Sequence, residues 1–275
     1  MSRRSRPRCS RFAAVVLVAT AAFGCGEPAR SGRPEALEML RSLALVSPLN
    51  PGGSYLLVGR WEVTAGEFDP AVAGPARRLP AAWLDRQQAR DWAAERGFRL
   101  PTRAEWRHVA TAAPTSSRLL TLTANTLDLD SRQGLPVGVF ERGKTSEGCY
   151  DLTGNLWEWV EDDVEGPLGL PGRAMACGGS FATWGWLGHA GRDGLRQLEA
   201  GERADDLGFR VVCGAEAWLV ERVLPLWRQE RWRAEVAAEF ARWRPRLRAQ
   251  LAVRLTRAQA DLAFCAAVQG ASGGS

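Results

Sequence analysis

The sequence predicts an α+β protein with an irregular domain over residues 36–214 and a helical extension over residues 215–268. Within the domain, short apolar runs alternate with Gly- and Pro-rich turns, and few segments have helical periodicity. The extension contains no glycine, and its apolar residues recur every three or four positions. These two observations define the expected fold class.

The first 25 residues have the composition of an export signal. Five arginines and no acid precede a run of twelve apolar residues, and Cys25 follows where a bacterial lipoprotein is cleaved and acylated. Such a run is too short to span a bilayer as a helix. We expect an exported bacterial protein, either periplasmic or attached to a membrane through a lipid anchor on Cys25. Residues 26–35 would form a tether and residues 269–275 a disordered tail.

The basic balance of the chain comes from this leader. The chain has 36 basic and 31 acidic residues, and five of the basic ones lie in residues 1–25, which leaves 31 of each sign. A mature protein without excess charge gives no electrostatic reason to expect nucleic acid as a partner.

Capping patterns predict two helices in the domain. Asp85 is a suitable N-cap for a helix over Arg86–Arg96, and Gly97 can end it. Thr102 and Glu105 have the spacing of a capping box, which predicts the start of a second helix.

The extension carries an apolar stripe that needs a cover. Pro225 and Pro245 should kink or divide its helices. The stripe could lie on an anionic membrane surface, pack on the preceding domain, or pair with a second copy of the chain. Its members are Trp232, Val236, Phe240, Trp243, Leu247, Leu251 and Leu255.

Cysteines and histidines give weak support for a zinc or iron site. The only histidines are His108 and His189, and no two cysteines have CxxC spacing. Disulfide pairing is plausible in an oxidising compartment, but the sequence does not select among Cys149, Cys177, Cys213 and Cys265.

Residues 148–162, GCYDLTGNLWEWVED, bring turn formers, acids and indoles together. Asp151 and Glu158 can share a calcium ion if the backbone turns tightly between them, and Gly154 permits the positive φ that such a turn requires. The same residues also suit a packed turn whose acids accept hydrogen bonds from backbone N–H groups. The residues alone leave both interpretations open.

This stretch resembles the G-N-x-W-E-W signature of the formylglycine-generating enzyme (sulfatase-modifying factor) family. Other blocks agree and follow the family's order: RWEVTAGEF, RLPTRAEWRHVA, LPVGVF, CGGSF and GFRVVC. Together they cover most of residues 55–213. The resemblance implies the family's C-type-lectin-like fold, with short strands and long structured loops.

The resemblance also implies structural calcium. The first site would use the side chains of Asp151 and Glu158 and the carbonyls of Gly154 and Leu156. A second site would use Asn125 with either Asp128 or Asp130.

The family's catalytic cysteines are replaced. The founding activity uses two cysteines, five residues apart after the G-G-S block, which bind copper as thiolates. Thr183 and Gly188 stand at the matching positions, and neither supplies a soft sulfur ligand. We therefore expect no copper and no formylglycine generation. A Cys177–Cys213 disulfide is an alternative to a catalytic role for Cys177.

The loop that remains would line the family's binding groove. The resemblance places there Ser180, Thr183, Trp184, Trp186, His189 and Arg192. Indoles and a guanidinium suit a peptide, glycan or protein ligand, although the tryptophans could instead be core residues. His189 and Ser180 are candidates for residual catalysis, and His108 is most simply structural.

Three functions are compatible with this pattern. The chain could be a non-catalytic, calcium-stabilised binding or scaffold module of the cell envelope. It could be an oxidoreductase or another enzyme that uses the same groove with different residues. It could also be an assembly component of an envelope complex that associates through its helical extension.

Overall fold

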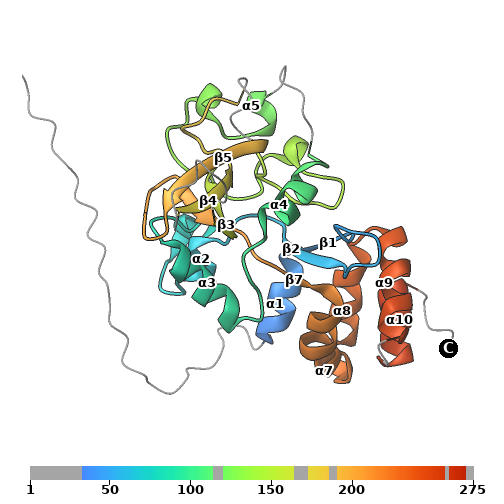
Figure 1. The fold of residues 1–275 in the computed structure, drawn as a ribbon. Coiled ribbons are helices and arrows are strands. Elements are labelled where there is room, and N and C mark those ends of the chain that lie inside the picture. The colour runs from blue at the N-terminus through green and yellow to red at the C-terminus, as the bar shows by residue number, and fades with distance from the viewer. Residues whose placement is uncertain (1–32, 114–119, 164–172, 186–190, 258–259, 271–275) are drawn as a thin grey trace, which may run out of the picture. The chain divides into compact units, whose positions relative to one another are not determined.

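Two small sheets organise the domain, and helices surround them (Figure 1). The computed structural model describes residues 33–113, 120–163, 173–185, 191–257 and 260–270. In these residues the first sheet is antiparallel with the order β1-β2-β7, formed by Leu43–Val46, Leu56–Gly59 and Val212–Gly214. The second has the order β5-β4-β3-β6, formed by Gly191–Glu199, Arg173–Gly178, Trp157–Asp163 and Leu207–Phe209. Strand β6 is parallel to β3.

Short helices connect and cover these strands. The helices of the domain are α1 Glu35–Arg41, α2 Ala65–Phe68, α3 Arg86–Glu95, α4 Arg103–Ala110 and α5 Leu120–Thr123. After β7 come α6 Ala215–Trp218, a π-helical turn Leu219–Val223, α7 Leu224–Trp227, α8 Glu230–Ala241, α9 Pro245–Arg257 and α10 Leu262–Gln269. The predicted α+β class is confirmed.

Both predicted capping motifs are present. The Asp85 carboxylate accepts a hydrogen bond from the Gln88 N–H at 2.9 Å, and the Gln88 side chain accepts from the Asp85 N–H. Gly97 follows α3 with a φ of 77°, a conformation that glycine adopts without a steric penalty. Thr102 and Glu105 form the same reciprocal pair at the start of α4.

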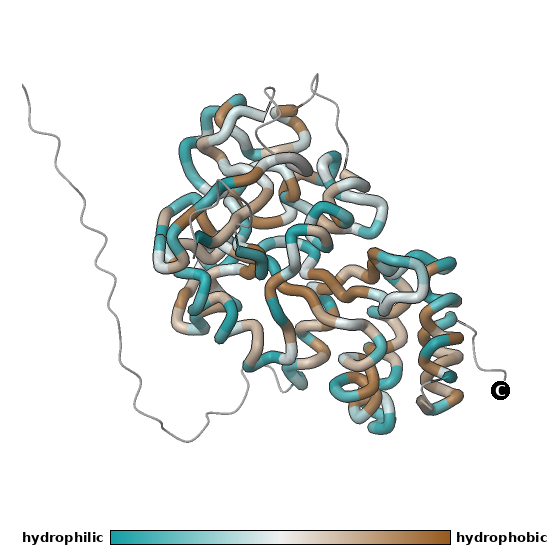
Figure 2. The backbone as a smooth tube through the Cα atoms, viewed as in Figure 1, coloured by the Kyte–Doolittle hydropathy of each residue, from teal (hydrophilic) through white to brown (hydrophobic). Residues whose placement is uncertain are grey.

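The helices after Gly214 share the domain's core, as in the alternative in which the apolar stripe packs on the preceding domain. Pro34–Ser275 is one compact unit. The Trp243 indole donates a hydrogen bond to the Leu43 carbonyl of β1 at 3.2 Å, and Phe240 packs edge-on against Phe264 of α10. Figure 2 shows the hydrophobic stretches of β1 and β2 that face this region. The apolar stripe therefore finds its cover within the same chain.

Proline positions divide the helices as the sequence predicts. Pro245 is the first residue of α9 and separates it from α8, where its missing N–H leaves no helical bond unmade. Pro225 is the second residue of α7, directly after the π-helical turn.

All four described cysteines are free and buried, so the Cys177–Cys213 disulfide, one of the alternatives that the sequence left open, is not formed. Cys177 lies on β4 and belongs to one core cluster, whereas Cys213 lies on β7 of the other sheet and belongs to a second cluster. Burial raises the pKa of the Cys149 thiol to about 11 and that of Cys177 to about 12.

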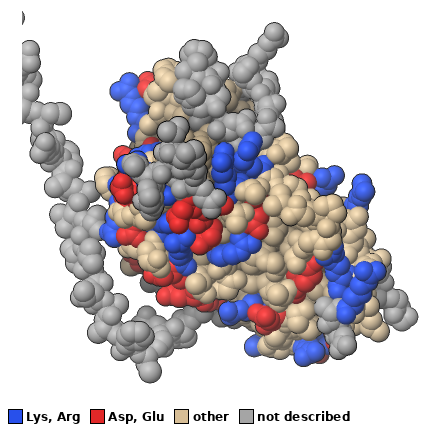
Figure 3. Space-filling model, in the orientation of Figure 1, with Lys and Arg blue, Asp and Glu red and all other residues tan. Residues whose placement is uncertain are grey.

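The residues of the expected export signal, including Cys25, and those of the expected tether through residue 32 lie outside the described residues. Within the described part of the chain, no helix has the length and apolar character needed to cross a membrane. Acidic and basic side chains are interspersed over the face shown in Figure 3.

Candidate functional site

The turn between Asp151 and Glu158 has an unusual backbone. Asp151, Gly154 and Asn155 have φ angles of 57°, 75° and 62°. A Cβ on Gly154 would lie 2.1 Å from the Asn125 carbonyl oxygen, so only glycine fits there. The Asn155 N–H donates to the same carbonyl at 2.6 Å. The predicted tight turn is present, and Asn125 is the residue against which it is built.

Glu158 forms a fully buried ion pair with Arg210. Arg210 Nη2 lies 2.6 Å from Glu158 Oε1, and Arg210 Nε lies 2.9 Å from Oε2. The side chains are 1% and 0% exposed. The Trp106 indole of α4 donates a further bond to Oε2 at 2.7 Å. Such a bidentate ion pair, with its additional hydrogen bond, satisfies both buried charges without water.

Arg210 also joins the two sheets. Its Nη1 donates to the Gly59 carbonyl of β2 at 2.8 Å, and its Nη2 donates to the Tyr150 carbonyl at 2.9 Å. Because Glu158 lies on β3 of the second sheet, one guanidinium connects both sheets and the loop before the turn.

Two further buried carboxylates lie beside this pair. Glu62 is 0% exposed; its Oε1 accepts from Asn155 Nδ2 at 2.9 Å, while its buried Oε2 has no hydrogen-bond donor. Asp151 Oδ2 accepts from the Gly138 N–H at 2.7 Å. Burial raises the pKa of Glu62 well above its ordinary value, and the charges of Asp151 and Glu158 raise it further. Burial also raises the pKa of Asp151 to about 6.

This arrangement bears on the expected first calcium site. Three carboxylates, from Glu62, Asp151 and Glu158, surround one guanidinium, and an orphaned carboxylate oxygen remains, which is a setting that favours an additional cation. Against this, the Glu158 oxygens already accept from Arg210 and Trp106. No group of three or more His, Cys, Asp and Glu side chains in the described residues has a metal-binding arrangement. The expected calcium site has only two carboxylates, and its other ligands are the backbone carbonyls of Gly154 and Leu156. It is therefore not a group of that type.

The residues of the expected second calcium site have protein partners. The buried Asn125 amide donates to the Gln133 carbonyl at 2.9 Å, and its oxygen accepts from Ser131 Oγ. Asp128 accepts from the Gly185 N–H at 2.8 Å, and Asp130 is exposed and pairs with Arg132. These contacts are those of a packed turn whose acids cap N–H groups.

The described part of the expected groove is small. Ser180 is 0% exposed, and its hydroxyl donates to Asp206 Oδ2 at 2.8 Å. Thr183 Oγ1 accepts from the Ser180 N–H at 3.1 Å, which closes a short turn. Trp184 is 43% exposed, so this indole is not a core residue. Outside the described residues lie Trp186, Gly188, His189 and the side chain of Arg192.

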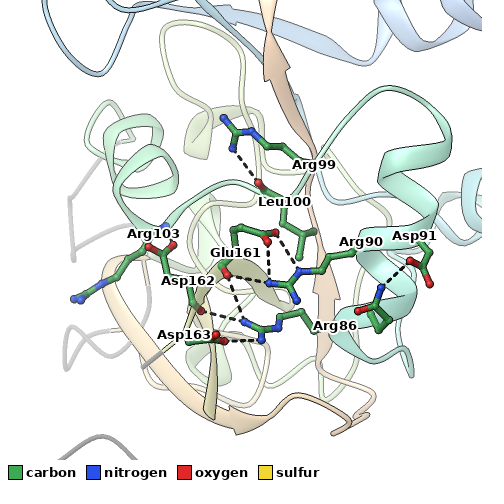
Figure 4. A network of polar contacts seen from close by, with 10 residues as sticks. Arg86, Arg90, Asp91, Arg99, Leu100, Arg103, Glu161, Asp162 and Asp163 are labelled. Carbon is green, nitrogen blue, oxygen red and sulfur yellow. Dashed lines mark hydrogen bonds and ion pairs between the residues drawn. The ribbon is translucent and has the colours of Figure 1, made fainter. Parts of the chain in front are cut away.

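Figure 4 shows a separate polar network where β3 ends against α3 and α4. Arg90 binds the Glu161 carboxylate at 2.8 Å, and Arg86 pairs with Asp163 at 2.5 Å. The Arg103 N–H at the start of α4 donates to the Asp162 carboxylate. Each acid has a partner on a neighbouring helix, so the network holds α3 and α4 to the sheet.

The described residues form an irregular α+β domain, and buried polar groups hold its central turn. These features define the class of protein. Residues 60–215 match the model of the family described as "Sulfatase-modifying factor enzyme 1-like domain". The chain belongs to this family. Membership gives this region the family's C-type-lectin-like fold.

One curated relative and several solved structures are similar to the chain. "Inactive C-alpha-formylglycine-generating enzyme 2" from Mus musculus is 28% identical over 183 residues, which are 56% of this chain and 58% of the relative's length. "Treponema denticola variable protein 1" is 18% identical with a TM-score of 0.49 and covers 58% of this chain and 84% of its own. PvdO from Pseudomonas aeruginosa is 20% identical with a TM-score of 0.48, covering 57% and 80%.

Sequence reasoning missed two members of the buried site. Glu62 stands in the EVT block and Arg210 in the GFR block, both of which were recognised only as family signatures. An acid or an arginine inside an otherwise apolar strand segment was the available signal, because a charge in such a place needs a partner.

Proposed function

We propose that this chain is a member of the family without formylglycine-generating activity, and that its loop after β4 binds a ligand without transforming it. The observation that carries this proposal is the environment of Thr183. Its hydroxyl is held in the turn with Ser180, in a position where the family requires a copper-binding thiolate. A hydroxyl keeps its proton near neutral pH and does not bind soft copper(I).

The surroundings of Ser180 favour binding over a new catalytic chemistry. Its hydroxyl is fully buried and bound to Asp206, so it is not placed to attack a substrate. The exposed Trp184 beside it offers a flat aromatic face for a peptide, glycan or protein ligand. The name of the mouse relative, which includes the word inactive, agrees with this proposal.

The absence of activity has a direct test. The purified protein is incubated with copper, dioxygen and a peptide that carries a sulfatase motif, and the peptide mass is measured. We expect no loss of mass from conversion of the cysteine to an aldehyde. The matched variant Thr183→Cys/Gly188→Cys should gain tight copper(I) binding. Conversion of the peptide by the natural sequence would overturn the proposal.

The binding role has a separate test. The protein is applied to peptide and glycan arrays, and the strongest ligand is titrated against Trp184→Ala. Trp83→Ala is the matched control, since Trp83 is also exposed, at 61%, but lies in the loop before α3. We expect the first variant to lose at least about tenfold in affinity, which is typical of a central aromatic contact, and the control to bind normally. Equal loss in both variants would refute a site at Trp184.

We further propose that calcium binds at Asp151, and that the protein is exported. The excess of buried carboxylates over cations around Arg210 supports the first proposal, and the composition of residues 1–25 supports the second. Calcium titration by calorimetry, with Asp151→Asn as the variant, tests the metal; fractionation of cells that produce the full chain tests export. An assembly role has less support, because the apolar stripe of the helices is covered within the chain.

A further inference from the structure

A cavity lies beside the Asp151 turn, with Gly138 and Tyr150 among its lining residues. Its volume is about 300 Å³, at the lower end of the range for small-molecule sites. Trp61, Val137 and Tyr150 supply apolar and aromatic walls, and Glu67, Arg77 and Arg78 supply charged groups. None of these residues belongs to the loop after β4.

The arginines of this cavity have no carboxylate partner among the described residues. Arg77 Nη1 donates to the Val72 carbonyl at 2.9 Å, which fixes the guanidinium without neutralising it. Arg78 is exposed, and its guanidinium makes no hydrogen bond or ion pair with a described residue. Arg60 lies over the Trp61 ring at 5.1 Å and the Tyr150 ring at 5.6 Å and donates to the Gly148 carbonyl.

Few acids oppose Arg77 and Arg78, the two cations that line the cavity. Glu67 is the only carboxylate among the described lining residues, and its Oε2 is held by the Thr64 N–H and hydroxyl, both at 2.8 Å. Asp151 lies behind the wall, where it accepts from the Gly138 N–H. Beside Tyr150, Glu141 forms an ion pair with Lys144, so the charges of these two side chains offset each other. The cavity therefore has a positive rim above an aromatic wall.

The shape of the cavity depends on a close crossing of two segments. A Cβ on Gly66 would lie 2.8 Å from the Arg77 side chain, so a glycine is needed where the 3₁₀ turn Gly74–Arg78 passes α2. The capping box of Thr64 and Glu67 fixes the other side. The Gly66 crossing and the capping box therefore fix the position of the turn that carries Arg77 and Arg78.

We propose that this cavity is a second binding site, for a small anion that joins an oxyanion to a flat apolar body. The oxyanion would accept hydrogen bonds from Arg78 and from the remaining donors of Arg77. The apolar body would pack against the wall that Trp61 and Tyr150 form together. A neutral analogue would lack the ionic contact, and a bare inorganic anion would lack the aromatic one.

Calorimetric titration of the full chain with phenyl phosphate, phenylacetate, inorganic phosphate and phenol tests the proposal. We expect one of the two aromatic anions to bind at least about tenfold more tightly than phenol or inorganic phosphate. Arg78→Gln should weaken that binding by at least about tenfold, because a charge-assisted contact is lost. Arg246→Gln, which changes an exposed arginine of α9, should bind as the natural sequence does.

Two further measurements keep the result interpretable. Thermal unfolding of Arg78→Gln should match that of the natural sequence, because the side chain is exposed. The groove variant Trp184→Ala should bind the aromatic anion normally, which separates this site from the proposed groove. Equal binding by Arg78→Gln and the natural sequence, or no binding of either aromatic anion at millimolar concentration, would overturn the proposal.

Discussion

Replacing Arg210 with methionine should be among the most destabilising single changes in this protein. Methionine keeps much of the side-chain length but removes the charge that offsets Glu158. The guanidinium makes two hydrogen bonds to that carboxylate and one each to the Gly59 and Tyr150 carbonyls. Removing one partner of a buried ion pair costs about 3–5 kcal/mol. The carbonyls that lose a donor add to this, so we expect a loss of about 4 kcal/mol or more.

Urea unfolding at pH 7, followed by tryptophan fluorescence, measures this loss. A domain of ordinary stability has about 5–15 kcal/mol to lose, so the variant would be marginal at room temperature. Arg132→Met is the matched control, because its pair with Asp130 is 79% and 63% exposed and should contribute nothing measurable.

A double variant distinguishes the cost of an unpaired buried charge from the cost of lost packing. In Arg210→Met/Glu158→Leu both charges are gone, so no buried ion is left unpaired. We expect the double variant to be more stable than Arg210→Met alone, which would be strong coupling between the two positions. A loss below about 1 kcal/mol in the single variant, or simple addition of the two single effects, would refute the reasoning.

Three other predictions concern the same turn. Because burial raises the pKa of Asp151 from 3.8 to about 6, the folded state takes up a proton between about pH 6 and pH 4 that the unfolded chain does not. The calcium-free protein should therefore gain up to about 3 kcal/mol of stability from this group as pH falls through that window, and Asp151→Asn should remove the gain. Calcium at pH 7 should raise the midpoint of thermal unfolding and flatten this pH dependence; an unchanged midpoint with saturating calcium would count against the metal. Gly154→Ala should lose about 3 kcal/mol in urea unfolding, since its Cβ would overlap the Asn125 carbonyl, while Gly201→Ala, which meets no atom within 4 Å, should be neutral.

The local elements were predictable from the sequence because their signals are local. The pairs Asp85 with Gln88 and Thr102 with Glu105 lie three residues apart and fix the starts of α3 and α4. The apolar stripe of the extension likewise follows from helical spacing alone. What covers the stripe did not follow, because periodicity reveals that a face is buried but not what lies against it.

The buried site was only half predictable, because its members come from distant parts of the chain. Asp151, Gly154 and Glu158 were singled out, and the tight turn between them is present. Arg210 was not, because it meets Glu158 only through the parallel pairing in which Glu158 lies opposite Gly208. Without that register, the assignment of Glu158 to a metal rested on the family resemblance. The geometry of the turn has the buried hydrogen bonds of a packed polar turn, and the calcium site stays a prediction.

The separation of the Cys177 and Cys213 thiols affects how the protein responds to oxidising conditions. Cys177 and Cys213 point into different hydrophobic clusters, and their protons are held too tightly for thiolate chemistry at neutral pH. An oxidant can therefore cross-link them only after the native packing has opened. Among the described residues, the buried thiols form no disulfide, so the fold of this part of the chain depends on packing.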